Sequence, residues 1–285
     1  EAPVPVVAVR QRRVAPGGAA NVAANVVALG GEALLVGVVG EDAAGQSLRE
    51  CLRNERISDE RVVTVTGRPT TMKTRVIARG QQVVRVDEEA DTPILPETVE
   101  RLGLLVQQAV VGSDALLIED YNKGVVIPGL IDTALKAAKT KGIPIVVDPK
   151  FHHFFEFTGA TLFKPNRREL ADALGVGVDL SQIGVLRDAV NRLGVEHLLV
   201  TLGSEGMLLV GRDGNPHEIP SQARDVFDVS GAGDTVTAWA GAALAAGASV
   251  LEAALIANLA AGVEVAKAGV ATVSPDEVLT AHAVP

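Results

Sequence analysis

The sequence has very little cysteine, since Cys51 is the only one among 285 residues. A lone thiol excludes a framework of disulfides within the chain and suits a reducing compartment, so we expect a cytoplasmic protein. Long apolar runs are also missing, because Glu252 and Glu264 interrupt the most apolar stretches. Residues 1–7 lack the basic and apolar regions of a signal peptide and an initiator Met, so we expect further residues upstream.

Positive charge is in deficit as well. The net charge is −9 and the sequence pI is about 5.1. Nucleic acids and anionic membranes need clustered Lys and Arg, so neither is expected as the main partner, although a local basic pocket could bind a small anion. With 47% hydrophobic and 21% charged residues, the composition predicts a folded protein in which residues 1–285 form a single domain.

Short apolar runs alternate with helical patterns between residues 114 and 202. The runs at 114–120, 143–149, 161–166 and 197–203 read as strands, and 127–141 reads as a helix. This alternation is typical of βαβ units and predicts a parallel sheet covered by helices. A helix over 17–30 and a buried strand over 33–40 precede it.

Residues 62–87 have a different pattern, because strand-like alternation continues there without helices between the strands. We expect an antiparallel ribbon, which could form one small lid sheet with a strand over 3–14. Every second residue of the ribbon is polar or basic, which gives it a basic face. This face could bind an anion, or it could equally be an ordinary solvated surface. These residues are Lys73, Arg75, Arg79, Gln82 and Arg85.

The stretch DVSGAGDTVTAWAGAALAAG, residues 228–247, predicts a helix whose first turn is unusually small. Gly231, Ala232 and Gly233 leave the unpaired N–H groups of that turn accessible, and such groups attract anions. Asp234 could cap the helix, or it could accept a hydroxyl proton beside a bound phosphate. The local pattern leaves both roles open.

Two separated segments carry a family resemblance. DVSGAGDT at 228–235 resembles the C-terminal signature of the ribokinase-like (PfkB) carbohydrate kinases, and PGGAANVAANVVALG at 16–30 resembles their N-terminal glycine-rich signature. The resemblance implies an α/β protein with a three-layer α/β/α fold, a mainly parallel central sheet and a small β-sheet lid. It also implies ATP and Mg²⁺ as cofactors, with Asp234 as the base and Gly231 to Gly233 as the anion hole.

The same resemblance assigns further residues to the nucleotide and its ions. Asn166 and Glu169 would position Mg²⁺ and its waters, Thr201, Gly203 and Gly206 would form the nucleotide loop, and Asn258 and Gly262 would lie beside the adenine. Asp228, Ser230 and Ser274 could contribute to a K⁺ site. Simpler interpretations stay open: Asn166 and Ser274 as helix caps, and residues 201–206 as a plain turn.

Within the family, substrate-side segments such as MKTRVIARGQQVVRVDEE and EDYNKG resemble heptose 7-phosphate kinases. That resemblance implies transfer of the ATP γ-phosphoryl group to the anomeric hydroxyl of a heptose 7-phosphate. Cations suit its distal phosphate, and small or polar residues suit its hydroxyls. The candidates are Lys73, Arg75, Arg85 and Lys123 for the phosphate, and Gly17, Gly18, Asn21 and Asp120 for the hydroxyls. The family also suggests a homodimer through the lid sheet.

Three alternatives compete with this interpretation. Another PfkB-type kinase, such as a ribokinase, fructokinase or nucleoside kinase, would share the core motifs. A sugar- or nucleotide-binding sensor would keep the fold without chemistry, although an intact Asp234 argues against it. A zinc or histidine-based hydrolase is weaker, because His152 and His153 lack other ligands at metal spacing and read as surface or packing residues. The resemblance also implies a first strand with a sugar-binding aspartate, which would precede Glu1, so we expect the given sequence to be truncated or renumbered.

Overall fold

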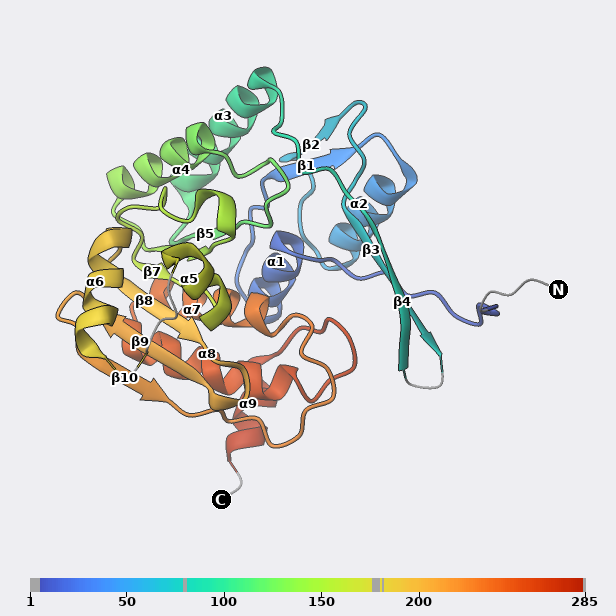
Figure 1. Cartoon of the computed structure of the whole chain (residues 1–285). Helices are drawn as coiled ribbons and strands as arrows, with labels where there is room; N and C mark the ends of the chain where they lie inside the picture. Colours follow the sequence, from blue (N-terminus) through green and yellow to red (C-terminus); the bar gives the residue numbers. More distant parts are fainter. Residues whose placement is uncertain (1–5, 79–80, 176–179, 181, 284–285) are drawn as a thin grey trace.

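Parallel strands in the middle of the chain organise the molecule, and helices pack on both of their faces (Figure 1). The computed structural model describes residues 6–78, 81–175, 180 and 182–283. The strands are β1(Gly37–Gly40), β2(Val62–Val65), β3(Met72–Ala78), β4(Gln81–Glu88), β5(Leu116–Glu119), β6(Ile145–Asp148), β7(Leu162–Phe163), β8(His197–Thr201), β9(Met207–Gly211) and β10(Pro216–Ile219). The helices are α1(Ala19–Ala28), α2(Ala43–Asn54), α3(Pro96–Gly112), α4(Pro128–Lys141), α5(Arg167–Leu174), α6(Ile183–Leu193), α7(Ala232–Ala245), α8(Val250–Glu264) and α9(Pro275–His282), with 3-10 turns η1(Phe151–His153) and η2(Gly203–Glu205).

The central sheet has the strand order β10-β9-β8-β7-β6-β5. Strands β5 to β8 are parallel neighbours, which confirms the βαβ pattern expected from the sequence. Strands β9 and β10 are antiparallel additions at one edge. The carboxyl ends of the parallel strands lie together, and in such sheets this edge carries the ligand site.

Alternation along β6 shows how the three layers form. Ile145 and Val147 belong to the core that includes α3 and α4, whereas Val146 belongs to the core that includes α7 and α8. Figure 1 shows the two helix pairs on opposite sides of the sheet. A strand buried on both faces needs apolar residues at every position, which explains the run IPIVV. The predicted three-layer α/β/α fold is confirmed.

A smaller unit lies beside this sheet. Strands β1 and β2 pair in parallel, and they bury Val39 and Val62 in a core shared with α1 and α2. The expected strand over 33–40 is therefore shorter at its start, and Cys51 lies in α2 as a free thiol. Helix α1 also packs against α7, which brings the two glycine-rich segments together.

Strands β3 and β4 form an antiparallel ribbon that projects from the body (Figure 1). The ribbon was expected, but its predicted extent was wrong for 62–65, because β2 pairs with β1 instead. Nor do residues 6–14 form a strand; residues 3–5 lie outside the described part. Val6 and Val9 are 85% and 64% exposed, so the apolar residues that alternate in this segment are not buried against the rest of the protein.

Capping boxes begin α5, α8 and α9. In α9, Ser274 accepts from the main-chain N–H of Glu277, as its cap interpretation predicted. Helix α7 has no side-chain cap in the described part of the chain, and the same holds for α1, α3, α4 and α6. Of the helices that the structure describes, none has the length and apolar character needed to cross a membrane.

Candidate active site

Helix α7 begins at a turn that excludes side chains. Gly231 has a φ of 102°, in the region that favours glycine. A Cβ atom at Gly231 would also lie 3.1 Å from Glu264 Oε1 and 3.3 Å from Asn21 Nδ2. No described side chain caps this helix, and the Ala232 N–H makes only a long bond, 3.4 Å, to the Val229 carbonyl oxygen. The other N–H groups of this turn are therefore open to an anion.

This turn opens into a cavity of about 270 Å³. The cavity brings together several residues that the sequence had assigned to one site, from distant parts of the chain. Its lining consists of Tyr121, Asp148, Lys150, Lys164, Asn166, Glu169, Thr201, Gly231, Gly233 and Asp234. The open helix end and the Asn166–Glu169 pair therefore face one space.

Asp234 is held by two donors. Asn21 Nδ2 donates to its Oδ2 and the Tyr121 hydroxyl donates to its Oδ1, each over 2.8 Å. Burial, which leaves Asp234 only 7% exposed, raises its pKa above the usual value. The two donated hydrogen bonds act in the opposite direction, because they favour the ionised form. The carboxylate is fixed in orientation and lines the cavity, which suits a base better than a simple cap.

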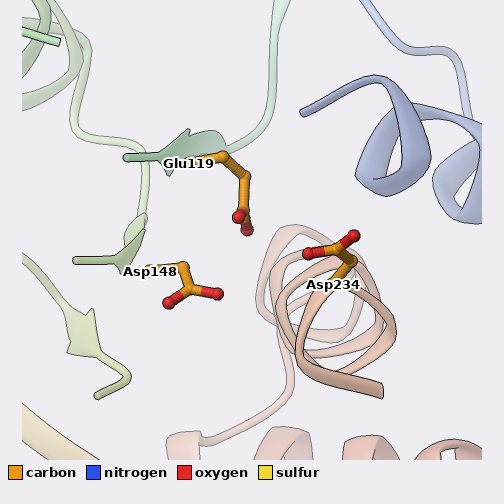
Figure 2. Close-up of side chains that lie close together, drawn as sticks. All are labelled: Glu119, Asp148 and Asp234. Carbon is orange, nitrogen blue, oxygen red and sulfur yellow. The ribbon is translucent and has the colours of Figure 1, made fainter. Parts of the chain in front are cut away.

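Three carboxylates lie close together at this end of the sheet (Figure 2). Glu119 ends β5, Asp148 ends β6 and Asp234 lies in α7; one oxygen of each lies within 4.8 Å of the others. Within the described residues, neither oxygen of Glu119 has a hydrogen-bond partner. Burial, followed by the charges of Asp148 and Asp234, raises the pKa of Glu119 well above its usual value. Burial and the neighbouring carboxylates therefore favour the protonated form of Glu119.

Lys164, directly after β7, supplies a buried positive charge to this cluster. Its side chain is 4% exposed, and Nζ lies 2.9 Å from Asp148 Oδ2. Burial is the largest single influence and would lower the pKa of Lys164, but the nearby carboxylates, led by Asp148, together outweigh burial and raise it. A Cβ atom at Gly233 would lie 3.5 Å from Nζ, so this ammonium adjoins the first turn of α7.

Asn166 and Glu169 begin α5 and bond to each other in a capping box. Asn166 Oδ1 accepts from the Glu169 N–H, and Glu169 Oε2 accepts from the Asn166 N–H, each over 2.8 Å. The other Glu169 oxygen pairs with Lys150 Nζ at 2.5 Å. The cap interpretation is thus correct, yet both residues also line the cavity. The capping box fixes their positions there.

The expected nucleotide residues divide into two groups. Thr201 lines the cavity, and its backbone bridges to Asn166. Gly203 and Gly206 lie between β8 and β9, where a Cβ atom at Gly206 would be 2.1 Å from the Ile219 carbonyl oxygen. Asn258 donates to the Pro220 carbonyl oxygen over 2.8 Å, and Gly262 packs against the backbone of Gln222. Apart from Thr201, these residues lie outside the cavity lining.

Of the four expected sugar residues, Asn21 and Gly18 adjoin Asp234 and Tyr121. Asn21 contacts Asp234 directly. A Cβ atom at Gly18 would lie 3.2 Å from Tyr121 Cε2, so Gly18 leaves room for that ring. Gly17 has open space around it. Asp120 is 1% exposed; its Oδ1 accepts from the Asn122 N–H over 2.8 Å, and its Oδ2 has no partner in the described residues.

Acidic residues pair with most of the basic candidates on the ribbon. Lys73 pairs with Asp87 at 3.1 Å and with Glu89 at 2.7 Å. Lys123 pairs with Glu89 at 2.6 Å, and Arg85 pairs with Asp87 at 3.0 Å. Of the expected basic face, Lys73 and Arg85 are therefore neutralised by acidic partners, whereas Arg79 lies outside the described residues. Arg75 has no ion pair among the described residues, and its charge helps to lower the pKa of Asp228.

Asp228 and Ser230 lie just before the first turn of α7. Asp228 accepts from the Ser230 N–H over 2.9 Å and from the Gly269 N–H over 3.2 Å. Although burial opposes them, these donors lower the pKa of Asp228. Ser274, by contrast, is engaged as the α9 cap. Glu264 is fully buried near Gly231, and burial raises its pKa to about 8.

Several residues of this site were missed in the sequence. Glu119, Asp148 and Lys164 directly end or follow strands of the parallel sheet. The rule that ligands bind at the carboxyl ends of such strands could have found them. Tyr121 and Lys150 follow the same strands by two residues, and only their contacts distinguish them from ordinary loop residues.

Comparison with known proteins agrees with this geometry. The model of the pfkB family carbohydrate kinases matches residues 2–277. Bifunctional protein HldE of Pelobacter propionicus is 44% identical over 288 residues, covering 99% of this chain and 58% of that protein. Bifunctional protein HldE of Rhodospirillum rubrum is 41% identical, covering 99% of this chain and 57% of that protein. The chain thus spans less than two thirds of these relatives.

Among solved structures, Arabidopsis thaliana ribokinase complexed with ribose and ATP has a TM-score of 0.76 at 24% identity. The likeness covers 97% of this chain and 90% of that one, and it supports the same fold. The family model and the glycine-rich segments at 16–30 and 228–235 agree. The chain belongs to the pfkB family of carbohydrate kinases.

Proposed function

We propose that this carbohydrate kinase transfers the γ-phosphoryl group of ATP to the anomeric hydroxyl of a heptose 7-phosphate, giving the 1,7-bisphosphate. One observation carries the proposal: the cavity joins the uncapped first turn of α7 and Asp234 to the Asn166–Glu169 pair. The choice of sugar is supported by the substrate-side segments and by the similarity to bifunctional proteins HldE.

In this reaction Asp234 removes the proton of the acceptor hydroxyl. The N–H groups of Gly231 and Gly233 stabilise negative charge on the moving phosphoryl group, and that of Ala232 joins them by exchanging its long bond to the Val229 carbonyl oxygen. The Lys164 ammonium adds a buried positive charge beside Gly233. Each such donor is worth roughly 3 kcal/mol in comparable oxyanion sites. Electrostatic stabilisation by these donors is therefore the main contribution of the chain.

The donor set fits Mg²⁺, which prefers oxygen ligands. Asp148 Oδ1 is buried without a hydrogen-bond partner in the described residues, and Asp148 lines the same cavity as Asn166 and Glu169. These residues would hold the ion directly or through water. When bound, Mg²⁺ neutralises charge on the nucleotide phosphates. We also propose K⁺ as a structural ion at Asp228 and Ser230, beside the anion hole.

Arg75 is our leading candidate for the distal phosphate, because Lys73, Arg85 and Lys123 already have acidic partners. Gly17, Gly18, Asn21 and Asp120 remain the candidates for the sugar hydroxyls. Thr201, Gly203, Gly206, Asn258 and Gly262 remain those for the nucleotide. A homodimer through the lid ribbon and a cytoplasmic location are further parts of the proposal.

Release of ADP, measured against a panel of acceptors, tests the substrate. We expect turnover with heptose 7-phosphate to exceed turnover with fructose 6-phosphate and with ribose. The Asp234→Asn variant serves as the blank for contaminating kinases. Preference for an unphosphorylated sugar would overturn the proposed substrate but retain the kinase, whereas ATP consumption that ignores every acceptor would overturn both.

A further inference from the structure

Tyr121 is the only tyrosine of the chain, and it connects three parts of the candidate active site. Its hydroxyl donates to Asp234 Oδ1 over 2.8 Å. Its ring adjoins Gly18, where a Cβ atom would lie 3.2 Å from Cε2. Lys150 Nζ lies 5.5 Å from the ring centroid. The ring is therefore held by the glycine-rich segment before α1 and by a cation that lines the cavity.

The second donor to Asp234 is equally well fixed. Asn21 is 1% exposed, and its main-chain oxygen accepts from Asn25 Nδ2 over 3.1 Å. Each oxygen of Asp234 thus has one donor from the protein. A carboxylate oxygen can accept two hydrogen bonds, so either oxygen can also receive a substrate hydroxyl.

We propose that Tyr121 is a positioning residue for phosphoryl transfer: its hydroxyl holds Asp234 Oδ1 so that the carboxylate meets the acceptor ionised and in one orientation. The proposal rests on the proposed function, in which Asp234 is the base. Without the Tyr121 hydroxyl, the carboxylate would keep one donor and could rotate about its side-chain bond. Its ionised form would also lose a stabilising contact.

Tyr121 itself does not exchange a proton in this step. The acceptor proton moves to Asp234 while the acceptor oxygen bonds to the γ-phosphorus of ATP and the bond from that phosphorus to the leaving ADP oxygen breaks. Burial, followed by the charge of Asp234, raises the pKa of Tyr121 above its ordinary value. Tyr121 therefore stays protonated and acts only as a hydrogen-bond donor.

The Tyr121→Phe variant removes the hydroxyl and keeps the ring against Gly18. We expect kcat to fall about ten- to hundredfold, as for loss of a hydrogen bond to a charged group, with little change in the KM for ATP. The acidic limb of the kcat–pH profile should move to higher pH, because the pKa of Asp234 rises once a donor is lost. A purely structural role would leave this limb in place.

The Thr140→Val variant is the matched control. It also deletes one hydroxyl, which donates to the Lys136 carbonyl oxygen on the exposed face of α4. Its kcat and pH profile should equal those of the parent. Circular dichroism and thermal unfolding establish that both variants are folded.

A spectrum without substrate tests the contact independently of activity. Because Tyr121 is the sole tyrosine, labelling tyrosine with ¹³C at Cζ gives one resonance, which reports the environment of its hydroxyl. Asp234→Asn replaces the charged acceptor with a neutral amide, so this resonance should shift at neutral pH. An unchanged resonance in the folded Asp234→Asn variant would overturn the contact and the proposal.

The two levels of inference can fail separately. If Asp234→Asn is inactive while Tyr121→Phe keeps the parental kcat and pH profile, the base stands and the role of Tyr121 is overturned. If Asp234→Asn turns over within a few-fold of the parent, the base itself is wrong, and the proposed function must be revised first.

Discussion

At the residue scale, Asp234 combines two features that a capping carboxylate does not need: burial, and donors on both oxygens. We expect Asp234→Asn to leave the protein folded and able to bind ATP, but to lower kcat about a hundred- to ten-thousandfold, the range for loss of a general base. Steady-state kinetics and calorimetric binding of ATP measure the two effects.

A matched control exists in α9. Asp276 also lies in the first turn of a helix, but it is exposed. If a first-turn carboxylate acts only on helix stability, Asp234→Asn and Asp276→Asn should behave alike, each costing at most about 1 kcal/mol with activity retained. Similar activities of the two variants would therefore remove Asp234 from the chemistry.

Glu264 predicts a pH dependence of stability. Burial raises its pKa from 4.5 to about 8, so between these values the folded chain binds a proton that the unfolded chain has lost. Its stabilising contribution is full below the unfolded pKa and is lost as the pH rises through about 8. Glu264→Gln stays neutral and should raise the melting temperature at about pH 9 relative to the parent, with little gain at about pH 5.

The exposed Glu100 on α3 supplies the comparison, because Glu100→Gln removes a carboxyl group that is already solvated. Its melting temperature should follow the parent at both pH values. An equal response of the Glu264 and Glu100 variants would mean that Glu264 is ionised in the folded protein at neutral pH.

Side-chain chemistry at a helix start could be predicted from the sequence, whereas contacts between distant segments could not. Gly231, Gly233 and Asp234 predict an anion hole, because glycine destabilises a helix and its presence in the first turn therefore suggests another role. Tyr121 carries no such local signal; its role depends on meeting Asp234, 113 residues further along the chain. Likewise, the sequence shows that Asp87 and Glu89 are acidic, but it does not show which residues face each other across the ribbon. Their ion pairs with Lys73 could therefore not be predicted.

At the scale of elements, the turn between β8 and β9 depends on Gly206. Its φ is 99°, and a Cβ atom would lie 2.1 Å from the Ile219 carbonyl oxygen. Gly206→Ala should therefore destabilise the protein by more than about 2 kcal/mol in chemical denaturation, from backbone strain and displacement of β10. Gly112→Ala in α3, with nothing within 4 Å, should stay within about 1 kcal/mol of the parent.

Helices and strands could be predicted where the pattern of apolar residues allows only one kind of element. Strands β5 to β8 follow from apolar runs between helices, because only a parallel sheet buries both faces of such runs. Alternation in 62–65 identified a strand but not its neighbour, since pairing depends on where β1 lies. Strands β9 and β10 were not predicted, because the glycine loop before them was assigned to the nucleotide.

At the scale of the whole molecule, the lid ribbon leaves apolar side chains in solvent. Val84 and Val86 are 46% and 49% exposed. If this ribbon is the dimer interface, Val84→Asp should shift the protein from dimer to monomer in analytical ultracentrifugation. Val111→Asp, at a 76% exposed position on α3, should leave the mass unchanged. A parental protein that sediments as a monomer would refute the proposed homodimer.

The hydrogen bond from Asn21 to Asp234 joins residues 213 positions apart. During synthesis on the ribosome, α1 and the parallel strands emerge well before α7, so a nascent chain holds most of the fold without a working centre. Completion of the centre must await the last helices, and such long-range closure slows folding. If Asp234 is the base, a chain whose synthesis has not reached α7 cannot catalyse phosphoryl transfer, however much of the sheet has already folded.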